Sequence, residues 1–213
     1  MPTKIVHMAV YDTLADWEVG AATAHINNPR WQVAPGTFRV RTVGLTKDPI
    51  TTMAGVRIVP DVALADLGPA DSAMLILPGA DLWGGDDLVP FAHKARELVD
   101  AGVPVAGICG ATLGLAKEGL LDNRAHTSNA AEVLQYSGYS GTAHYVAAPA
   151  VTGDNVITAA AMAPFEFARE VLGLLGVYEP RILEAWYRLY GHSDPTGYAK
   201  LAEYEARMAG AVR

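Results

Sequence analysis

The sequence is poor in cysteine, in positive charge and in long hydrophobic runs. A single cysteine among 213 residues excludes an internal disulfide and fits a reducing compartment. The formal net charge of −7 gives no electrostatic reason to expect nucleic acid or an anionic membrane as a partner. No apolar run approaches the roughly 20 residues that a membrane helix needs, and the first residues resemble a strand more than a signal peptide. We therefore expect a cytoplasmic protein that binds neither nucleic acid nor membrane.

Patterns that bind metals or phosphates are also missing. No CxxC occurs, and no two histidines have the i, i+4 spacing of helical metal ligands. A glycine-rich stretch at 78–85 lacks the lysine of the phosphate-binding GxxxxGK[ST] loop. The sequence thus predicts neither a metal nor a cofactor, and the expected partner is a small-molecule substrate.

What is present is an alternation of short apolar segments with helical patterns. Hydrophobic residues make up 51% of the chain, which favours a packed core over disorder. Strands are expected at 5–10, 38–43, 55–59, 72–77, 103–108, 145–151 and 155–159, with an extended piece at 125–128. Helices are expected at 17–27, 61–67 (a turn or two), 88–101, 110–117, 129–136, 164–175, 180–190 and 195–208. This order predicts an α/β fold with a mostly parallel sheet covered on both faces, followed by a helical tail.

The only cysteine stands at the end of the apolar, β-branched segment 103–108, and small residues with helical spacing follow it. The pattern predicts a strand, a sharp turn at Cys109 and a helix that begins at Gly110. The Gly107-x-Cys109-x-Ala111 spacing is the thiol counterpart of the hydrolase nucleophile elbow. A helix N-terminus favours the thiolate, which is the reactive form. The alternative is a small buried hydrophobe, which is the usual role of a lone cysteine.

Two other features follow expected strands and would lie at the same sheet edge. Asp16 and Glu18 come after the first strand, where desolvation would raise the pKa of a carboxyl group and let it donate a hydrogen bond to a thiolate. Alternatively, Asp16 caps the next helix and Glu18 lies in its first turn. The glycine-rich loop after 72–77 is either an oxyanion hole built from backbone N–H groups or a tight surface turn.

Histidine is the usual base for a cysteine nucleophile. Of the six histidines, His126 and His144 follow the elbow and could approach it. His126 is the candidate that we retain.

Four segments then stand in a familiar order: Pro78-Gly79, 107–111, 119–124 and 155–158. Over roughly residues 4 to 176 the chain resembles the ThiJ/PfpI superfamily, the class I glutamine-amidotransferase-like group that includes intracellular proteases, isonitrile hydratases and glyoxalases. The resemblance implies a flavodoxin-like three-layer sandwich and commonly a homodimer. Residues 1–177 would form this domain, with 178–213 as its C-terminal helical extension.

The resemblance also implies roles for individual residues. Cys109 matches the family nucleophile, and Glu18 matches the acidic residue whose protonated carboxyl contacts the thiol. Five neighbours are assigned to oxyanion and substrate binding: Gly79, Ala80, Gly110, Trp83 and Asp16. The family histidine aligns with Ser128, and His126 stands two residues earlier, a step of about 6.5–7 Å along the same face of an extended segment.

The sequence leaves three functions open. The leading hypothesis is a cysteine-dependent hydrolase or lyase that acts on a small molecule through Cys109, tuned by Glu18. The alternative is a non-enzymatic redox sensor or stress protein in which Cys109 is oxidised to a sulfinate. A binding module that kept the fold and lost the chemistry is the third. Family proteases often carry histidine directly after the cysteine; Gly110 stands there, so protease activity of that kind is not expected.

Overall fold

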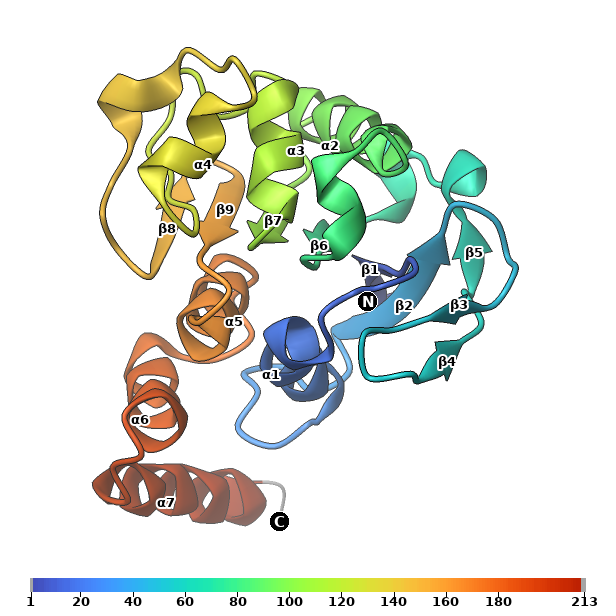
Figure 1. Cartoon of the computed structure of the whole chain (residues 1–213). Helices are drawn as coiled ribbons and strands as arrows, with labels where there is room; N and C mark the ends of the chain where they lie inside the picture. Colours follow the sequence, from blue (N-terminus) through green and yellow to red (C-terminus); the bar gives the residue numbers. More distant parts are fainter. Residues whose placement is uncertain (1, 212–213) are drawn as a thin grey trace.

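Short apolar strands form the central sheet of the computed structural model, which describes residues 2–211 (Figure 1). The strand order is β5-β2-β1-β6-β7-β9-β8, and neighbouring strands are parallel except for β8 and β9. These strands are β1 Lys4–Ala9, β2 Phe38–Gly44, β5 Val62–Ala63, β6 Met74–Leu77, β7 Val105–Ile108, β8 Ala150–Gly153 and β9 Val156–Ala159. The mostly parallel sheet predicted from the sequence is confirmed.

Helices cover both faces of this sheet (Figure 1). Helices α1 (Asp16–Asn27) and α5 (Pro164–Leu174) lie on one face, and α2 (Val89–Asp100) and α3 (Ala111–Lys117) lie on the other. The remaining helical elements are α4 Ala131–Gln135, α6 Pro180–Gly191, α7 Thr196–Ala211 and the short 3-10 turns η1 Leu64–Asp66, η2 Pro69–Asp71, η3 Asp81–Gly84 and η4 Gly141–His144. The flavodoxin-like three-layer arrangement with C-terminal helices is thereby confirmed.

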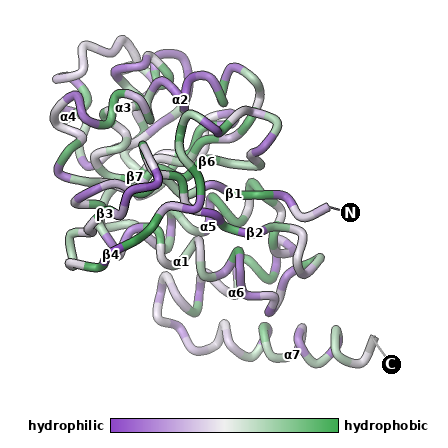
Figure 2. Tube along the Cα trace, turned by 90° about the vertical axis from the view of Figure 1, so that its right-hand side faces the viewer, coloured by the Kyte–Doolittle hydropathy of each residue, from purple (hydrophilic) through white to green (hydrophobic). Residues whose placement is uncertain are grey.

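The core explains why the central strand β6 is apolar throughout. In β6, Leu75 and Leu77 join the cluster under α2 and α3, whereas Met74 and Ile76 join the cluster under α1 and α5. Successive side chains of a strand point to opposite faces, so a sheet covered on both faces needs apolar residues at every position. Figure 2 shows this concentration of hydrophobic residues along central strands such as β1 and β6.

The irregular parts of the chain differ from the expected pattern. Segment 55–59 contributes only β4 (Arg57–Ile58), which pairs with the unpredicted β3 (Ile50–Thr51) in a separate antiparallel sheet. Segment 61–67 begins with β5 before its 3-10 turn. Strands of two residues leave no periodicity that a sequence reading can detect.

Two expectations around the elbow also need correction. Segment 125–128 forms no strand; His126 alone makes an isolated bridge to Tyr145. The helix expected at 129–136 shortens to α4, which Ala130 precedes as N-cap. Asn129 is therefore free of the capping role that its residue type suggests. The strand expected at 145–151 is shifted to β8 (Ala150–Gly153), and it pairs antiparallel with β9, the strand expected at 155–159.

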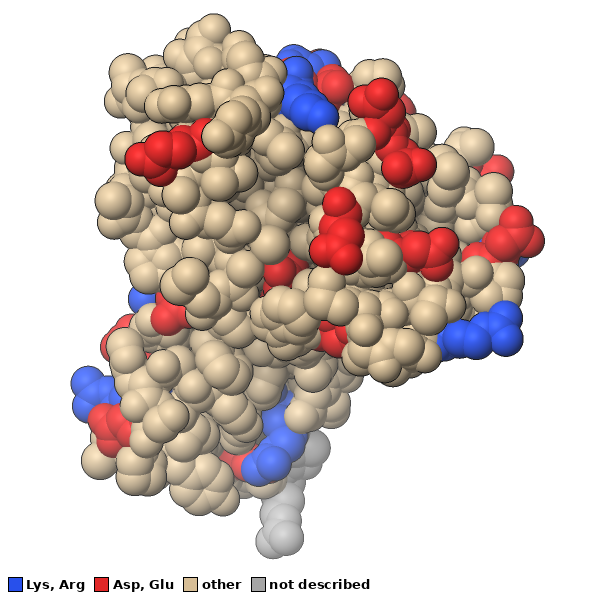
Figure 3. Space-filling model, in the orientation of Figure 1, with Lys and Arg blue, Asp and Glu red and all other residues tan. Residues whose placement is uncertain are grey.

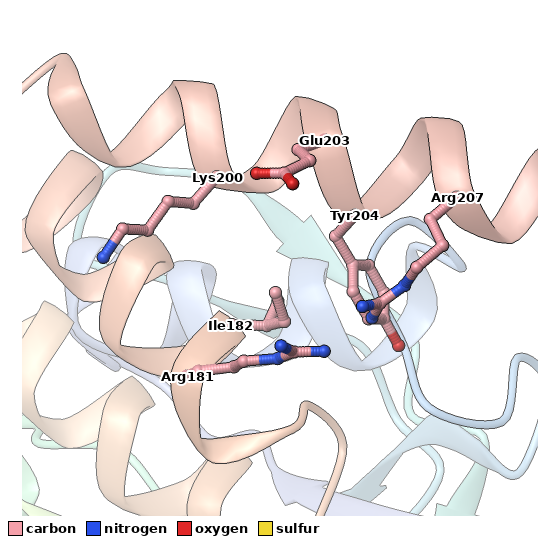
Figure 4. A pocket seen from close by; sticks show the side chains of 6 residues that line it. All are labelled: Arg181, Ile182, Lys200, Glu203, Tyr204 and Arg207. Atoms are coloured by element: carbon pink, nitrogen blue, oxygen red, sulfur yellow. The ribbon is translucent and has the colours of Figure 1, made fainter.

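The C-terminal helices extend the layer formed by α1 and α5 (Figure 1). Trp186 of α6 is fully buried in the same cluster as Phe167 of α5. Between α6 and α7 lies a surface cavity of about 510 Å³ (Figure 4), lined by Arg181, Ile182, Lys200, Glu203, Tyr204 and Arg207. The guanidinium groups of Arg181 and Arg207 lie 3.0 and 3.9 Å from the Glu179 carboxylate, so their charge is partly balanced within the protein.

The surface agrees with the charge expected from composition. Lysine and arginine side chains are scattered rather than gathered over the face that Figure 3 presents, among more prominent acidic groups. Within residues 2–211, no helix has the length and apolar character needed to cross a membrane.

Candidate active site

Cys109 lies on the sharp turn between β7 and α3, with a backbone φ of 58°. A positive φ is unfavourable for a residue with a side chain and is typical of strained functional turns. Small neighbours allow the turn, because a Cβ added to Gly107 would lie 2.7 Å from Leu115 Cδ1 and one added to Gly110 would lie 3.1 Å from Trp83 Cβ. The thiol is half-buried. The strand–turn–helix predicted for this segment therefore exists.

Glu18 points into the site from the first turn of α1 and is fully buried. Its Oε2 accepts a 2.6 Å hydrogen bond from the Gly79 N–H. The other oxygen, Oε1, has no hydrogen-bond partner among the described residues. Gly79 packs against both Cys109 and Glu18, because a Cβ at this position would lie 2.7 Å from Cys109 Cβ and from Glu18 Oε2.

Sheet topology explains why these residues meet. Strand β1 lies between β2 and β6, so the chain changes direction across the sheet at β1. The loop after β1 leads to α1 on one face, whereas the loop after β6 leads to η3 and α2 on the other. Loops that diverge in this way open a crevice at the carboxyl ends of the strands, which is where α/β proteins place their sites. Glu18 and Gly79 border this crevice, and β7 brings Cys109 beside it.

Burial raises the pKa values of both acids. Desolvation raises the pKa of Glu18, and this effect outweighs the hydrogen bond from the Gly79 N–H, which lowers the pKa. Desolvation also raises the pKa of the Cys109 thiol, the Glu18 charge adds to this rise, and N–H groups of Asn129 and Gly110 oppose it. The hydrogen bond with Cys109 lowers the pKa of Glu18, whereas Glu18 raises the pKa of the thiol. Two acids coupled in this way titrate as a pair. We therefore expect the pair to carry one negative charge before it carries two, with the proton shared between carboxyl and sulfur.

Asn129 is the residue that the sequence reading missed. Its Nδ2 lies 3.3 Å from Cys109 Sγ, and its Oδ1 accepts a 2.8 Å hydrogen bond from the Ala161 N–H. No local pattern marks it, since asparagine before a helix is an ordinary cap. The signal that could have found it is its position next to Ser128, the residue aligned with the family histidine.

His126 does not reach the thiol in this structure. The fully buried ring places Nδ1 2.8 Å from the Arg124 carbonyl and Nε2 3.3 Å from the Tyr139 hydroxyl. Within residues 2–211, neither ring nitrogen has a hydrogen bond to Cys109. The imidazole faces an aromatic pair, Tyr139 and Tyr145, rather than the sulfur. The expected approach of His126 to Cys109 is thus corrected. His126 stands two residues before Ser128, and at this position its ring packs into the core.

The oxyanion donors need a similar revision. The Gly79 N–H is already bound to Glu18. The Ala80 N–H, by contrast, has no acceptor among the described residues, and Gly110 N–H lies beside the sulfur. The N–H groups of Ala80 and Gly110 are therefore the two expected donors that do not bind Glu18.

Trp83 and Asp16 do not line the crevice as expected. Trp83 is 3% exposed, and its Nε1 donates to the Tyr11 hydroxyl and the Pro78 carbonyl. It supports the elbow from the core, where Gly110 and Gly114 leave room for its ring. Asp16 neither caps α1 nor bonds to the thiol; its Oδ2 accepts from the Ala54 N–H and holds the β3–β4 loop against α1.

The described residues, 2–211, contain no group of three or more His, Cys, Asp or Glu side chains arranged to hold a metal ion. The chemistry that this edge offers is that of a thiol, a buried carboxyl group, one side-chain amide and two backbone N–H groups.

A strained cysteine turn beside a buried carboxyl group, at the switch point of a parallel sheet, defines an α/β protein of the nucleophile-elbow class. The DJ-1/PfpI family model matches residues 4–174. The chain is 39% identical over 204 residues to the Bacillus subtilis (strain 168) protein named "Uncharacterized protease YoaZ", covering 94% of this chain and 97% of that protein. The chain belongs to the DJ-1/PfpI family.

Solved structures agree with this assignment. A thiJ/pfpI family protein from Bacillus anthracis superposes with a TM-score of 0.88 at 38% identity, covering 96% of this chain and 98% of that one. A DJ-1 superfamily protein from Agrobacterium tumefaciens gives a TM-score of 0.75 at 30% identity, covering 87% and 98% of the two chains. The resemblance read from the sequence is confirmed.

Proposed function

We propose that this protein is a cysteine-dependent hydrolase or lyase acting on a small molecule that carries an electrophilic carbon. The observation that carries the proposal is the convergence of the half-buried Cys109 thiol and the fully buried Glu18 carboxyl on Gly79. A buried acid with a raised pKa beside a nucleophile is an arrangement that costs stability and is typical of catalytic sites. A structural cysteine needs no such partner.

In the proposed reaction, Cys109 Sγ attacks the carbonyl carbon and forms a carbon–sulfur bond. The thiol proton passes to Glu18, and the carbonyl electron pair moves onto oxygen, where the Ala80 and Gly110 N–H groups stabilise the negative charge. For an ester, Glu18 then returns the proton to the leaving oxygen as the intermediate collapses to a Cys109 thioester. Water, deprotonated by Glu18, attacks the thioester, and the Cys109 sulfur leaves with that proton, which releases the acid and restores the thiol. For an oxoaldehyde, the proton goes to the oxygen to give a hemithioacetal, whose carbon-bound proton moves to the neighbouring carbon to give the thioester that water hydrolyses in the same way. Donors aimed at a charge that develops only during the reaction stabilise the transition state more than the substrate.

A substrate panel tests this proposal. Wild-type protein is incubated with p-nitrophenyl acetate as a model ester and with methylglyoxal as a model oxoaldehyde, and turnover is followed by absorbance. Cys109→Ser and Cys109→Ala should each lower any detected turnover at least about a hundredfold, because they remove the nucleophile. A Cys109→Ala protein that unfolds at the wild-type temperature and keeps full turnover would rule the mechanism out.

The redox sensor is the second candidate, supported by the absence of any imidazole hydrogen bond to Cys109 within residues 2–211. A sensor needs an accessible sulfur but no general base. Two equivalents of peroxide would oxidise the thiol to a sulfinate, with two waters released. Intact-mass measurement after mild peroxide should then find a gain of two oxygen atoms in wild type and none in Cys109→Ala. An unmodified wild-type mass would count against this role.

We also propose that the protein forms a homodimer and that it is cytoplasmic. Large apolar side chains are exposed near the site at Trp17, Met53 and Met162, and such surface is typical of contacts between protein copies. A free thiol is best preserved in a reducing compartment. Light scattering coupled to gel filtration gives the oligomeric state directly, and a monomer mass at working concentration would contradict the dimer.

A further inference from the structure

The side-chain amide of Asn129 has only one possible orientation. The Ala161 backbone N–H can only donate, so the atom that faces it, 2.8 Å away, must be the amide oxygen. The amide NH₂ is then the group that faces Cys109 Sγ at 3.3 Å. An asparagine amide is otherwise easily assigned the wrong way round, but here the backbone settles it.

The segment that carries Asn129 is fixed to the elbow from both sides. The Thr127 N–H donates to Thr158 Oγ1 at 2.8 Å, and Ser128 Oγ lies 2.7 Å from Thr112 Oγ1. Thr112 Oγ1 in turn donates to the Cys109 carbonyl at 2.6 Å. These bonds hold residues 127–129 in register with β9 and α3, so the amide stays near the sulfur.

A second anchor lies beyond Asn129. Ala161, whose N–H orients the amide, accepts a 3.2 Å bond from Trp17 Nε1 through its carbonyl oxygen. Trp17 is adjacent to Glu18 in α1. The two partners of the sulfur, the Glu18 carboxyl and the Asn129 amide, are thus tied to each other through one short connection.

The two partners differ in chemistry. A carboxyl group can give or take a proton, whereas an amide NH₂ can only donate a hydrogen bond. A donor stabilises negative charge on sulfur and cannot act as a base. This division differs from a cysteine–histidine pair, in which one ring does both.

We propose that Asn129 is a catalytic residue whose NH₂ group donates to Cys109 Sγ and stabilises its thiolate, leaving proton transfer to Glu18. Its contribution to turnover rests on the proposed function. Its effect on the thiolate does not, because thiolate formation can be measured without a substrate.

The test measures the alkylation rate of Cys109 by iodoacetamide as a function of pH, read by intact mass, in wild type, Asn129→Ala and Asn129→Asp. Removing the donor should slow alkylation near pH 7 about ten- to a hundredfold, the range expected for losing a hydrogen bond to a charged group. Asn129→Asp keeps an oxygen for the Ala161 N–H but turns a negative oxygen toward the sulfur, so it should be slower still.

The pH profile of Asn129→Ala separates this role from a merely structural one. Losing a donor to the thiolate should move the midpoint of the profile to higher pH and leave the limiting rate at high pH close to that of wild type. If Asn129 served only to hold Ala161, the midpoint would not move; an unmoved midpoint, or unchanged rates in both variants, would overturn the proposal. Asn155→Asp is the matched control, because the same chemical change falls at the opposite end of β9 and should leave the rate unaltered. If neither wild type nor any variant turns over a substrate but the alkylation rates follow the expected pattern, the proposed function fails and the role of Asn129 at the thiolate stands.

Discussion

At the scale of single residues, the site depends on how Glu18 and Cys109 share a proton. Burial raises the pKa of both groups, and the charge of Glu18 adds to the rise for the thiol. The reactive thiolate is therefore best formed when Glu18 holds the proton. Asn129 and the Gly110 N–H favour the same state by stabilising negative charge on sulfur.

Replacing Glu18 with glutamine should separate thiol ionisation from proton transfer. Glu18→Gln removes the charge that disfavours the thiolate, so alkylation of Cys109 by iodoacetamide near pH 7 should become faster. Turnover should fall by about 10²–10⁴ because the amide cannot carry a proton. Glu18→Asp keeps the charge and serves as the control, which should not accelerate alkylation. Slower alkylation in Glu18→Gln would contradict the charge argument.

Gly79 offers a second test at this scale. Gly79→Ala would place a Cβ 2.7 Å from Cys109 Cβ and from Glu18 Oε2, so the pair must separate. We expect a loss of about 1–3 kcal/mol in the free energy of unfolding, measured in urea, and altered alkylation of Cys109. Gly84→Ala lies in the same loop with no atom within 4 Å of the added Cβ, and it should be nearly neutral. Equal effects of the two variants would refute the packing argument.

Residue roles were predictable from the sequence only where local pattern and resemblance coincided. Cys109 stands at the end of an apolar strand, and Glu18 follows another, so both could be placed at one sheet edge. Asn129 could not, because its place depends on bonds from Thr127 and Ser128 to distant elements. Trp83 was misassigned for the converse reason, since nothing local shows that Gly110 and Gly114, at the start of α3 and within it, make room for its ring.

At the scale of elements, helix α1 joins the site to the C-terminal helices. Its first turn carries Glu18, and its last turn carries His25, which lies among Tyr178, Trp186 and Tyr190. The Trp186 Nε1–H donates to His25 Nε2 at 3.1 Å, so Nε2 carries no proton and Nδ1 donates to the Tyr178 hydroxyl at 2.8 Å. The neutral ring is thus the form that fits.

This arrangement makes stability depend on pH. Burial lowers the pKa of His25 from 6.5 to about 4. Above about pH 6.5 the ring is neutral in both states and has no effect. Between 6.5 and 4 the unfolded chain binds a proton that the folded chain does not, so stability falls as pH falls, by roughly 1–2 kcal/mol once solvent screening of the partly exposed ring is counted.

Urea unfolding at several pH values between 7 and 4 measures this effect. His25→Gln removes the titrating group and should flatten part of the decline seen in wild type. An identical pH dependence in the two proteins would show that His25 does not titrate as expected.

Elements were predicted well where they are long and regularly patterned, as with α1, α2, α5 and the central strands. The sequence could not indicate β3 or β5, because two-residue strands are fixed by their partners rather than by their own pattern. The same limit applies to segment 125–128, where the structure has a single isolated bridge, at His126.

At the scale of the whole molecule, the C-terminal helices α6 and α7 pack onto the same core as the rest of the fold. Trp186 and Leu201, from α6 and α7, share a buried cluster with Phe167 of α5 and Ile108 of β7. Side chains that share one cluster lose their packing together, which favours a single cooperative transition. The expectation that this tail extends the same domain can then be tested by calorimetry.

Wild-type protein should unfold in one calorimetric transition, and Trp186→Ala should move that whole transition to lower temperature. Truncating a fully buried tryptophan removes about 3–5 kcal/mol of stability, and here the bond to His25 is lost as well. Near-UV circular dichroism should lose its signal at the same temperature, because tryptophans outside the tail contribute to it and unfold in step. Glu184→Ala, on the exposed side of α6, is the control and should shift stability by less than about 0.5 kcal/mol. Two transitions, with only one displaced by Trp186→Ala, would mean that the tail is an independent unit and that the site edge around Cys109 and Glu18 is stable without it.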